Sequence, residues 1–159
     1  MSENICPCGH TQKNYVECCQ PLHDGASWAQ SPEQLMRSRY SAFVQQKIDY
    51  IVKTTAVGQQ SQLDVVALKE WSCRTQWHHL EVLQYEIVKD KRHAYVEFKA
   101  YFMQGTQLQA HHEKSAFVCL DQQWYFLDPT VDLHYTMKQS CICGSNKKFK
   151  ACCYSFLAI

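Results

Sequence analysis

The first third of the chain carries its hydrophobic residues at helical spacing. Ser31-Pro32-Glu33-Gln34 predicts a helix start, with a serine cap, a proline in the first turn and a glutamine able to close a capping box. A single apolar stripe follows, and it consists of Met36, Tyr40, Phe43, Val44, Ile48 and Ile51. Gly58 and the polar residues after it end the stripe. A second, shorter helix is predicted from about Leu63 to Trp71, with Leu63, Val66 and Ala67 on its apolar side.

From Trp77 onward the hydrophobic period changes to two. Alternate residues between 94 and 102 are apolar, which predicts a half-buried strand. Further strands are predicted near 80–89, 107–120 and 124–127, and tight polar turns separate them. Helices followed by a curled antiparallel meander predict an α+β cone.

Eight of the ten cysteines form two copies of one pattern, one copy near each end of the chain. In each copy a Cys-x-Cys pair is followed closely by a Cys-Cys pair. The copies are Cys6, Cys8, Cys18 and Cys19, and Cys141, Cys143, Cys152 and Cys153. Four soft thiolates can close a tetrahedral site around one metal ion. The sequence therefore predicts two metal sites, with Zn²⁺ as the expected ion and iron as the alternative.

A disulfide scaffold is the rival interpretation of so many cysteines. The first five residues have neither the basic head nor the apolar run of a secretory signal. No stretch approaches the roughly 18 consecutive apolar residues of a membrane span. The protein is therefore expected in the cytoplasm, where thiols stay reduced. The cysteines are also clustered rather than spread along the chain, and this favours metal.

The second copy, Cys141-Ile-Cys-Gly-Ser-Asn-Lys-Lys-Phe-Lys-Ala-Cys152-Cys153, resembles the SEC-C motif, the zinc-binding tail of the bacterial SecA translocation ATPase. The first copy is similar, with one more residue between its cysteine pairs, and this residue is expected to bulge the connecting turn. Two such motifs flanking Pro21-Leu22-His23 and the 35–43 segment resemble the YchJ family, UPF0225.

The YchJ resemblance implies an NTF2-like middle domain, named after nuclear transport factor 2, in which the sheet can leave a pocket at its open end. The predicted division is an N-terminal zinc knuckle at residues 1–24, the NTF2-like domain at 25–137 and a C-terminal SEC-C zinc knuckle at 138–159.

The predicted sheet offers a small set of groups for catalysis. His111 and Glu113 share one face of their strand with Ser115, and His112 faces the other way. A His–Glu pair inside an apolar cone could act as a base and its orienting acceptor. No nucleophile motif, phosphate loop or paired acid accompanies it, so the sequence favours a binding protein over an enzyme. A pocket enzyme or small-molecule-binding domain that uses this pair is the alternative.

Four other side chains are given structural roles. Cys73 and Cys119 are expected as small core residues. Arg37 and Arg39, on the long helix, are expected to pack and form ion pairs around the edge of the sheet.

The C-terminal copy also carries basic and aromatic residues for contact with a partner, and they are Lys147, Lys148, Phe149 and Lys150. In SecA-like tails this type of motif docks an acidic chaperone, so the resemblance implies a protein partner and a link to secretion or translation. Nucleic acid or the ribosome is the second hypothesis. The formal net charge is +1, and eight thiolates with two divalent ions would bring it to about −3, which disfavours nonspecific nucleic-acid binding. Alternatively, the knuckles only cap the ends of the domain.

Overall fold

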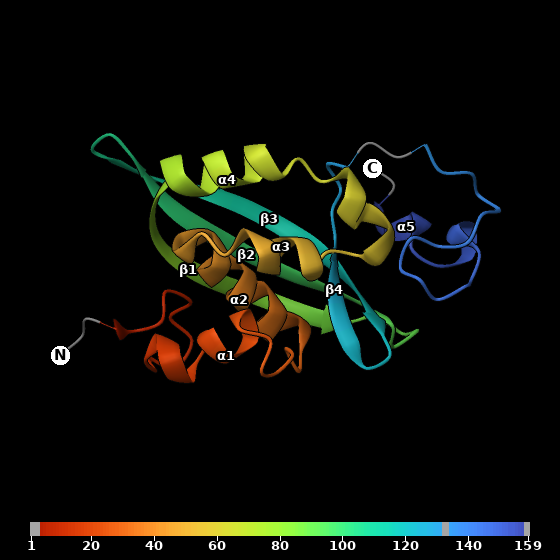
Figure 1. Ribbon diagram of the computed structural model, residues 1–159, viewed down its shortest axis with the longest axis horizontal. Helices are drawn as coiled ribbons and strands as arrows, with labels where there is room; N and C mark the ends of the chain where they lie inside the picture. The colour runs from red at the N-terminus through yellow and green to blue at the C-terminus, as the bar shows by residue number, and fades with distance from the viewer. Residues whose placement is uncertain (1–3, 132–133, 158–159) are drawn as a thin grey trace.

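The computed structural model describes residues 4–131 and 134–157 and shows one antiparallel sheet with helices packed against it (Figure 1). The four strands are β1 (Gln76–Ile87), β2 (His93–Gln104), β3 (Gln107–Leu120) and β4 (Gln123–Leu127). They pair in chain order, each antiparallel to the next, which confirms the predicted meander. Along β2, Val96 and Phe98 are buried, whereas Tyr95 and Glu97 are half-buried, so the alternation predicted for this strand is confirmed.

The long helix α2 (Pro32–Gln45) starts where the sequence predicts. The hydroxyl of Ser31 accepts a hydrogen bond from the backbone N–H of Gln34 at 3.0 Å. The side chain of Gln34 accepts from the N–H of Gln30 instead of that of Ser31, so it does not close the expected capping box.

The predicted single apolar stripe is divided between two helices, α2 and α3 (Ile48–Lys53). Gln46 adopts the left-handed conformation with φ 58°. The N–H groups of Gln46 and Lys47 bond back to the carbonyls of Phe43 and Ala42, the two hydrogen bonds of a Schellman motif. The prediction of one continuous stripe is wrong here, because the chain turns at Gln46 and only then resumes its helical course.

The second predicted helix is α4 (Val65–Arg74), which is capped by the side chain of Asp64. Its predicted apolar side is wrong, because Val66 is 69% exposed and the inward residues are Leu68 and Ser72. The hydroxyl of Ser72 donates to the carbonyl of Phe43 and so joins α4 to α2. Cys73 is exposed rather than buried, since it lies on the outer side of the helix.

Helix α2 fills the centre of the molecule, between the sheet and the N-terminal segment. Leu35 and Ala42 of α2 are fully buried, as are Val96 and Phe117 of the sheet. Arg37 forms an ion pair, but with Glu33 one turn earlier in α2 at 2.8 Å and not at the edge of the sheet, because its side chain lies on the side of the N-terminal segment, where it donates to the carbonyl of Cys8.

Arg39 differs from its prediction. It is 8% exposed and forms no ion pair with any carboxylate in the described part of the chain. Its Nη1 donates to the carbonyl of Ile51 and the hydroxyl of Thr54, and its guanidinium lies 4.3 Å from the ring centre of Phe126. The predicted ion pair at the sheet edge is replaced by a buried cation above an aromatic ring.

Short helical segments hold the two ends of the chain to this body. The N-terminal segment contains η2 (Tyr15–Glu17) and α1 (Gln20–His23), and it lies against α2. The 3-10 turn η3 (Val57–Gln62) follows α3. The C-terminal segment contains η4 (Phe149–Ala151) and α5 (Tyr154–Leu157), and it lies at the end of the molecule beside β4 (Figure 1). In the described ranges no helix is both long and apolar enough to cross a membrane.

Candidate metal centres

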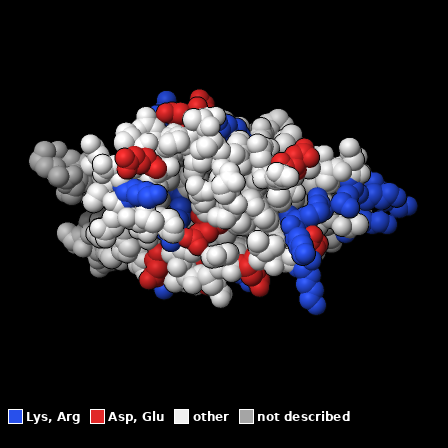
Figure 2. Space-filling model, turned by 90° about the horizontal axis from the view of Figure 1, so that it is seen from below, with Lys and Arg blue, Asp and Glu red and all other residues white. Residues whose placement is uncertain are grey.

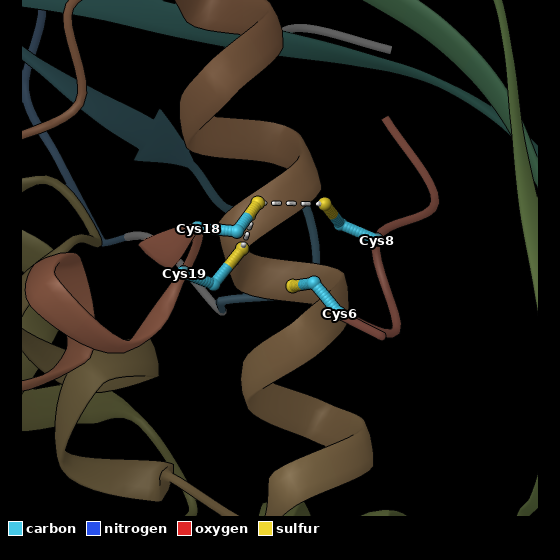
Figure 3. Close-up of side chains that lie close together, drawn as sticks. All are labelled: Cys6, Cys8, Cys18 and Cys19. Atoms are coloured by element: carbon cyan, nitrogen blue, oxygen red, sulfur yellow. Dashed lines mark hydrogen bonds between the residues drawn. The ribbon is translucent and has the colours of Figure 1, made fainter. Parts of the chain in front are cut away.

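The four N-terminal cysteines converge on one point (Figure 3). An antiparallel bridge between Ile5 and Asn14 closes the loop that carries Cys6 and Cys8, and Gly9 donates its N–H to the carbonyl of Cys6 at 3.1 Å. A further pair, Cys18 and Cys19, stands at the junction of η2 and α1. The four sulfur atoms lie within 4.8 Å of one another, on a loop that is too small to bury a core of its own.

The C-terminal cysteines repeat this layout. A bridge between Ser140 and Lys148 closes the loop, and the N–H of Cys141 donates to the carbonyl of Lys147 at 2.7 Å. The equivalent bond in the first copy, from Cys6 to Lys13, spans one more residue and has nearly the same length, 2.8 Å. The extra residue is therefore absorbed in the connecting turn, which confirms the predicted bulge and leaves both sulfur clusters closed.

The spacing of the sulfur atoms fits a tetrahedral ion. With metal–sulfur bonds of about 2.3 Å, tetrahedral geometry separates the sulfurs by about 3.8 Å. The Sγ of Cys18 lies 3.5 Å from that of Cys8 and 4.0 Å from that of Cys19. In the second cluster, Cys152 lies 3.7 Å from Cys143 and 3.8 Å from Cys153. All ten cysteines are free thiols, so the disulfide interpretation has no support, and each cluster could hold one metal ion.

Thiols within each cluster shift one another's pKa in opposite directions. A hydrogen bond with Cys19 holds the pKa of Cys6 far below its usual range, and the same bond raises the pKa of Cys19. Hydrogen bonds with Cys141 likewise lower the pKa of Cys143 and raise that of Cys153. One sulfur therefore ionises easily while another retains its proton, because adjacent thiolates repel. Full ionisation requires a cation at the centre, and this couples metal binding to proton release.

Helix α2 supports the N-terminal cluster. The hydroxyl of Ser41 lies 3.7 Å from the Sγ of Cys6, and Arg37 donates to the backbone carbonyl of Cys8 at 3.0 Å. His23 fastens the segment, since its Nε2 lies 2.9 Å from the carbonyl of Ser38 and its Nδ1 lies 2.7 Å from the hydroxyl of Tyr15. No charged side chain is hydrogen-bonded to a sulfur of this cluster in the described part of the chain.

The C-terminal cluster receives two basic side chains from the turn between β1 and β2. Arg92 places Nη1 at 3.4 Å from the Sγ of Cys152 and Nη2 at 3.9 Å from that of Cys143. His93 is fully buried, with Nε2 at 3.3 Å from the Sγ of Cys153 and Nδ1 at 2.6 Å from a carboxylate oxygen of Asp90. Carboxylate–histidine pairs beside metal ligands orient those ligands and tune their basicity.

The sequence pattern predicts neither residue as a neighbour of the cluster, because both fall in the polar turn predicted between the strands near 80–89 and 94–102. His93 is the first residue of β2, and strand alternation places it on the face of Tyr95, opposite to that of Ala94 and Val96. It is nevertheless fully buried, because the ring of Phe156 in the C-terminal segment stacks on it with ring centres 4.0 Å apart, and nothing in the local sequence indicates that contact.

The predicted partner-binding residues divide into two groups. Lys147, Lys148 and Lys150 are exposed. Phe149 is only 3% exposed and packs between the rings of Tyr135 and Tyr154, so the prediction of an aromatic contact at this position is corrected. Phe149 belongs to an apolar cluster that also contains Val118 and Leu127 of the sheet, so it helps to hold the knuckle against the domain.

The candidate catalytic pair lies at a cavity in the middle domain. The Nε2 of His111 is 3.0 Å from a carboxylate oxygen of Glu113, and both residues line a hollow of about 420 Å³ between the helices and the sheet. His112 points to the opposite face, where it bonds to Glu97 at 2.7 Å. The predicted separation of the two faces is confirmed, and the side chains of His111 and Glu113 remain 49% and 30% exposed.

Together, the α+β domain and its two sulfur clusters define a class: an NTF2-like fold flanked by four-cysteine motifs. Comparison with known families supports the domain and the C-terminal cluster. Residues 31–129 match the family described as "YchJ, middle NTF2-like domain", and residues 137–155 match the SEC-C motif. The chain belongs to the YchJ family, whose relatives carry the name UPF0225.

Relatives and solved structures match most of this chain or nearly all of it. A UPF0225 protein of Actinobacillus succinogenes is 44% identical over 153 residues, covering 96% of this chain and 98% of its own. A UPF0225 protein of Haemophilus influenzae strain Rd is 48% identical over 157 residues, covering 99% and 96%. The crystal structure of a SEC-C motif containing protein from Psychrobacter arcticus matches with a TM-score of 0.89 and 48% identity, covering 98% of both chains. The solution structure of RPA3114 from Rhodopseudomonas palustris, another SEC-C motif containing protein, matches with a TM-score of 0.68 and 36% identity, covering 75% of this chain and 92% of its own.

Proposed function

We propose that both clusters bind Zn²⁺ and that the protein is a metal-dependent protein-binding module of the cytoplasm, with an acidic partner in secretion or translation. The observation that carries this proposal is the group of exposed lysines on the C-terminal knuckle, above a cluster of buried sulfurs. The C-terminal metal site and the proposed partner surface are thus parts of one small unit.

Zinc is favoured by the closed sulfur environment. Each cluster offers four protein ligands and leaves no position for a substrate, which is typical of structural zinc. Structural zinc contributes about 10–16 kcal/mol in small peptides near neutral pH, enough to order a knuckle of this size. Iron also binds four thiolates, so the identity of the ion has to be measured.

The C-terminal end of the molecule is basic. Lys147, Lys148 and Lys150 are exposed there, and Lys91 and Arg92 come from the neighbouring β1–β2 turn. Figure 2 shows lysine and arginine side chains gathered at this end. With Phe149 buried, the aromatic expected between the lysines for stacking on bases is not at the surface. This favours an acidic protein over nucleic acid as the partner.

The metal proposal is tested by elemental analysis of protein purified without oxygen and without a histidine tag. We expect about two zinc ions per chain, falling by one in Cys18→Ser/Cys19→Ser and by one in Cys152→Ser/Cys153→Ser. Two irons per chain would replace zinc in the proposal, and metal-free protein would overturn it.

The partner proposal is tested by charge reversal. Lys147→Glu with Lys148→Glu should abolish capture of an acidic protein from a cytoplasmic extract, at unchanged metal content and melting temperature. Lys47→Glu with Lys69→Glu makes the same change of net charge on exposed residues of other elements and should leave capture intact. Equal capture by all three proteins would support knuckles that only cap the domain.

A pocket enzyme is the second candidate, because His111 and Glu113 meet at the cavity rim at 3.0 Å. A histidine oriented by a carboxylate can serve as a general base. If a turnover activity is found, His111→Ala and Glu113→Ala should each remove it without unfolding the domain. Full activity in both variants would rule out this mechanism.

A further inference from the structure

The middle domain keeps a cavity of about 420 Å³ between α2, α4 and the sheet. Protein interiors are close-packed, with few voids larger than a water molecule. Pockets for small molecules have volumes of about 300–1,000 Å³ and mostly apolar walls. The walls here include Phe43, Trp71, Trp77, Phe98 and Phe117, all large aromatic side chains that leave the space open rather than filling it. The hollow therefore has the size and lining of a ligand site.

The charged groups that line the cavity differ in whether they already have partners. Glu113 is hydrogen-bonded to His111 at 3.0 Å. Asp128 accepts from the backbone N–H and the hydroxyl of Thr130, at 2.8 and 2.6 Å. Both carboxylates thus already have hydrogen-bond partners within the protein.

Arg39 is the charged group whose hydrogen-bonding capacity is not used up. Its three hydrogen bonds all leave from Nη1, and neither Nε nor Nη2 has a partner within the described ranges. No fully buried side-chain nitrogen or oxygen lacks a partner there, so these two nitrogens belong to the 8% of Arg39 that stays accessible, at the cavity wall. Burial lowers the pKa of Arg39 to about 10, which keeps the guanidinium charged at neutral pH.

Two hydroxyl groups line the same cavity. Tyr40 and Ser115 are nine-tenths buried or more, and their hydroxyls have no hydrogen-bond partner among the residues that the structure describes. Each can donate to an oxygen atom of a ligand. The guanidinium edge and the two hydroxyl donors can bind a planar anionic group of a ligand, while the aromatic side chains contact the apolar remainder of that ligand.

We infer that this cavity binds a small organic acid with a flat apolar body, and that its carboxylate pairs with Nε and Nη2 of Arg39. The body of the ligand lies between the aromatic walls, and its head is held by the guanidinium fork. This inference does not depend on the metal sites or on partner docking, and it requires no catalysis by His111 and Glu113.

The test uses three probes that share one apolar body: 3-phenylpropionate, 3-phenylpropionamide and 3-phenylpropylamine. Binding to the folded protein as purified is followed by tryptophan fluorescence, because Trp71 and Trp77 line the cavity, and by the NMR signal of the Arg39 Nε–H. We expect the acid to bind about tenfold more tightly than the amide, and the amine to bind more weakly than both.

Two variants separate ligand binding from folding. Arg39→Met should bring the acid and the amide to equal affinity. Ala100→Leu, which fills the cavity without touching the bonds of Arg39, should weaken both probes while the spectrum of the folded protein is kept. Lys69→Met removes a charge from the exposed side of α4 and should change nothing.

Several outcomes would overturn the inference. The amide or the amine could bind wild type as tightly as the acid, or Arg39→Met could retain the preference for the acid. Binding unaffected by Ala100→Leu would place the probe elsewhere, and no binding of any probe in the millimolar range would leave the cavity without a ligand role. Each result is independent of the metal analysis, so this inference and the proposed function can fail separately.

Discussion

Arg92 brings a positive charge to the C-terminal cluster from a position 60 residues earlier than Cys152 in the sequence. Zinc bound by four thiolates carries a net charge of −2, whereas most thiols of the empty site are protonated. The guanidinium therefore stabilises the loaded site more than the empty one. Replacing Arg92 by methionine keeps much of the side-chain length and removes the charge.

The expected magnitude follows from the distance of 3.4 Å between Nη1 of Arg92 and the Sγ of Cys152. Two unit charges at this separation interact by about 1.2 kcal/mol in water and by about twice that at half the dielectric constant. Arg92 is half-buried, so water screens part of the interaction. We expect Arg92→Met to cost about 1–2 kcal/mol, which is about a five- to thirty-fold weaker affinity for zinc.

The assay is a competition titration against a chromophoric chelator in a Cys18→Ser/Cys19→Ser background, so that only the C-terminal site binds. Lys91→Met removes the neighbouring exposed charge and should weaken zinc binding by less than about twofold. If both variants had equal effects, the contribution would be general charge rather than this contact. An unchanged affinity in Arg92→Met would refute the reasoning.

Three further changes test the packing of the body. Burial lowers the pKa of His23, so the unfolded chain, with a His23 pKa near 6.5, takes up a proton at a higher pH than the folded protein does. The free energy of unfolding therefore falls as the pH falls below about 6.5. Between pH 7.5 and 5.5, urea unfolding should show a smaller fall in this free energy for His23→Gln than for wild type. A Cβ on Gly58 would lie 2.8 Å from the backbone oxygen of Ile142, so Gly58→Ala should cost about 1–3 kcal/mol of unfolding free energy, and unchanged stability would contradict that close approach. Leu35→Ala, at a fully buried position, should lower the unfolding free energy by about 2–5 kcal/mol. Leu83→Ala, where the side chain is 42% exposed, should lower it by less than about 0.5 kcal/mol, and equal losses would contradict the assigned core.

The sequence predicted those features that depend on neighbouring residues. Alternation between 94 and 102 identified a strand, because its period is a local property of the chain. The cysteine spacing identified both clusters, because each closes within about fourteen residues. Ser31 identified the start of α2, because a capping side chain accepts a hydrogen bond from the backbone N–H of a residue only three positions later in the chain.

Features set by distant contacts were not predictable in the same way. The break at Gln46 carries no glycine or proline, and an apolar stripe continues on both sides of it. The inward face of α4 is chosen by the helix it meets, through Ser72, rather than by its most apolar residues. His93 is joined to Cys153 across 60 residues, and nothing near it in the sequence specifies that partner.

The same four-cysteine pattern therefore occurs twice in two different environments. The four sulfurs of the C-terminal cluster are all buried; Arg92 donates to that of Cys152, and the Nε2 of His93 lies 3.3 Å from that of Cys153. In the N-terminal cluster, the Sγ of Cys6 lies beside the neutral hydroxyl of Ser41, and Cys18 is half-exposed. Because the guanidinium of Arg92 draws charge from a bound thiolate and burial blocks access, Cys18 should react with an alkylating or oxidising agent before any cysteine of the C-terminal cluster. Mass spectrometry of the zinc-loaded protein under limiting iodoacetamide should find Cys18 labelled before any C-terminal cysteine, and the reverse order would show that the surrounding charges do not govern the reactivity of these sulfurs.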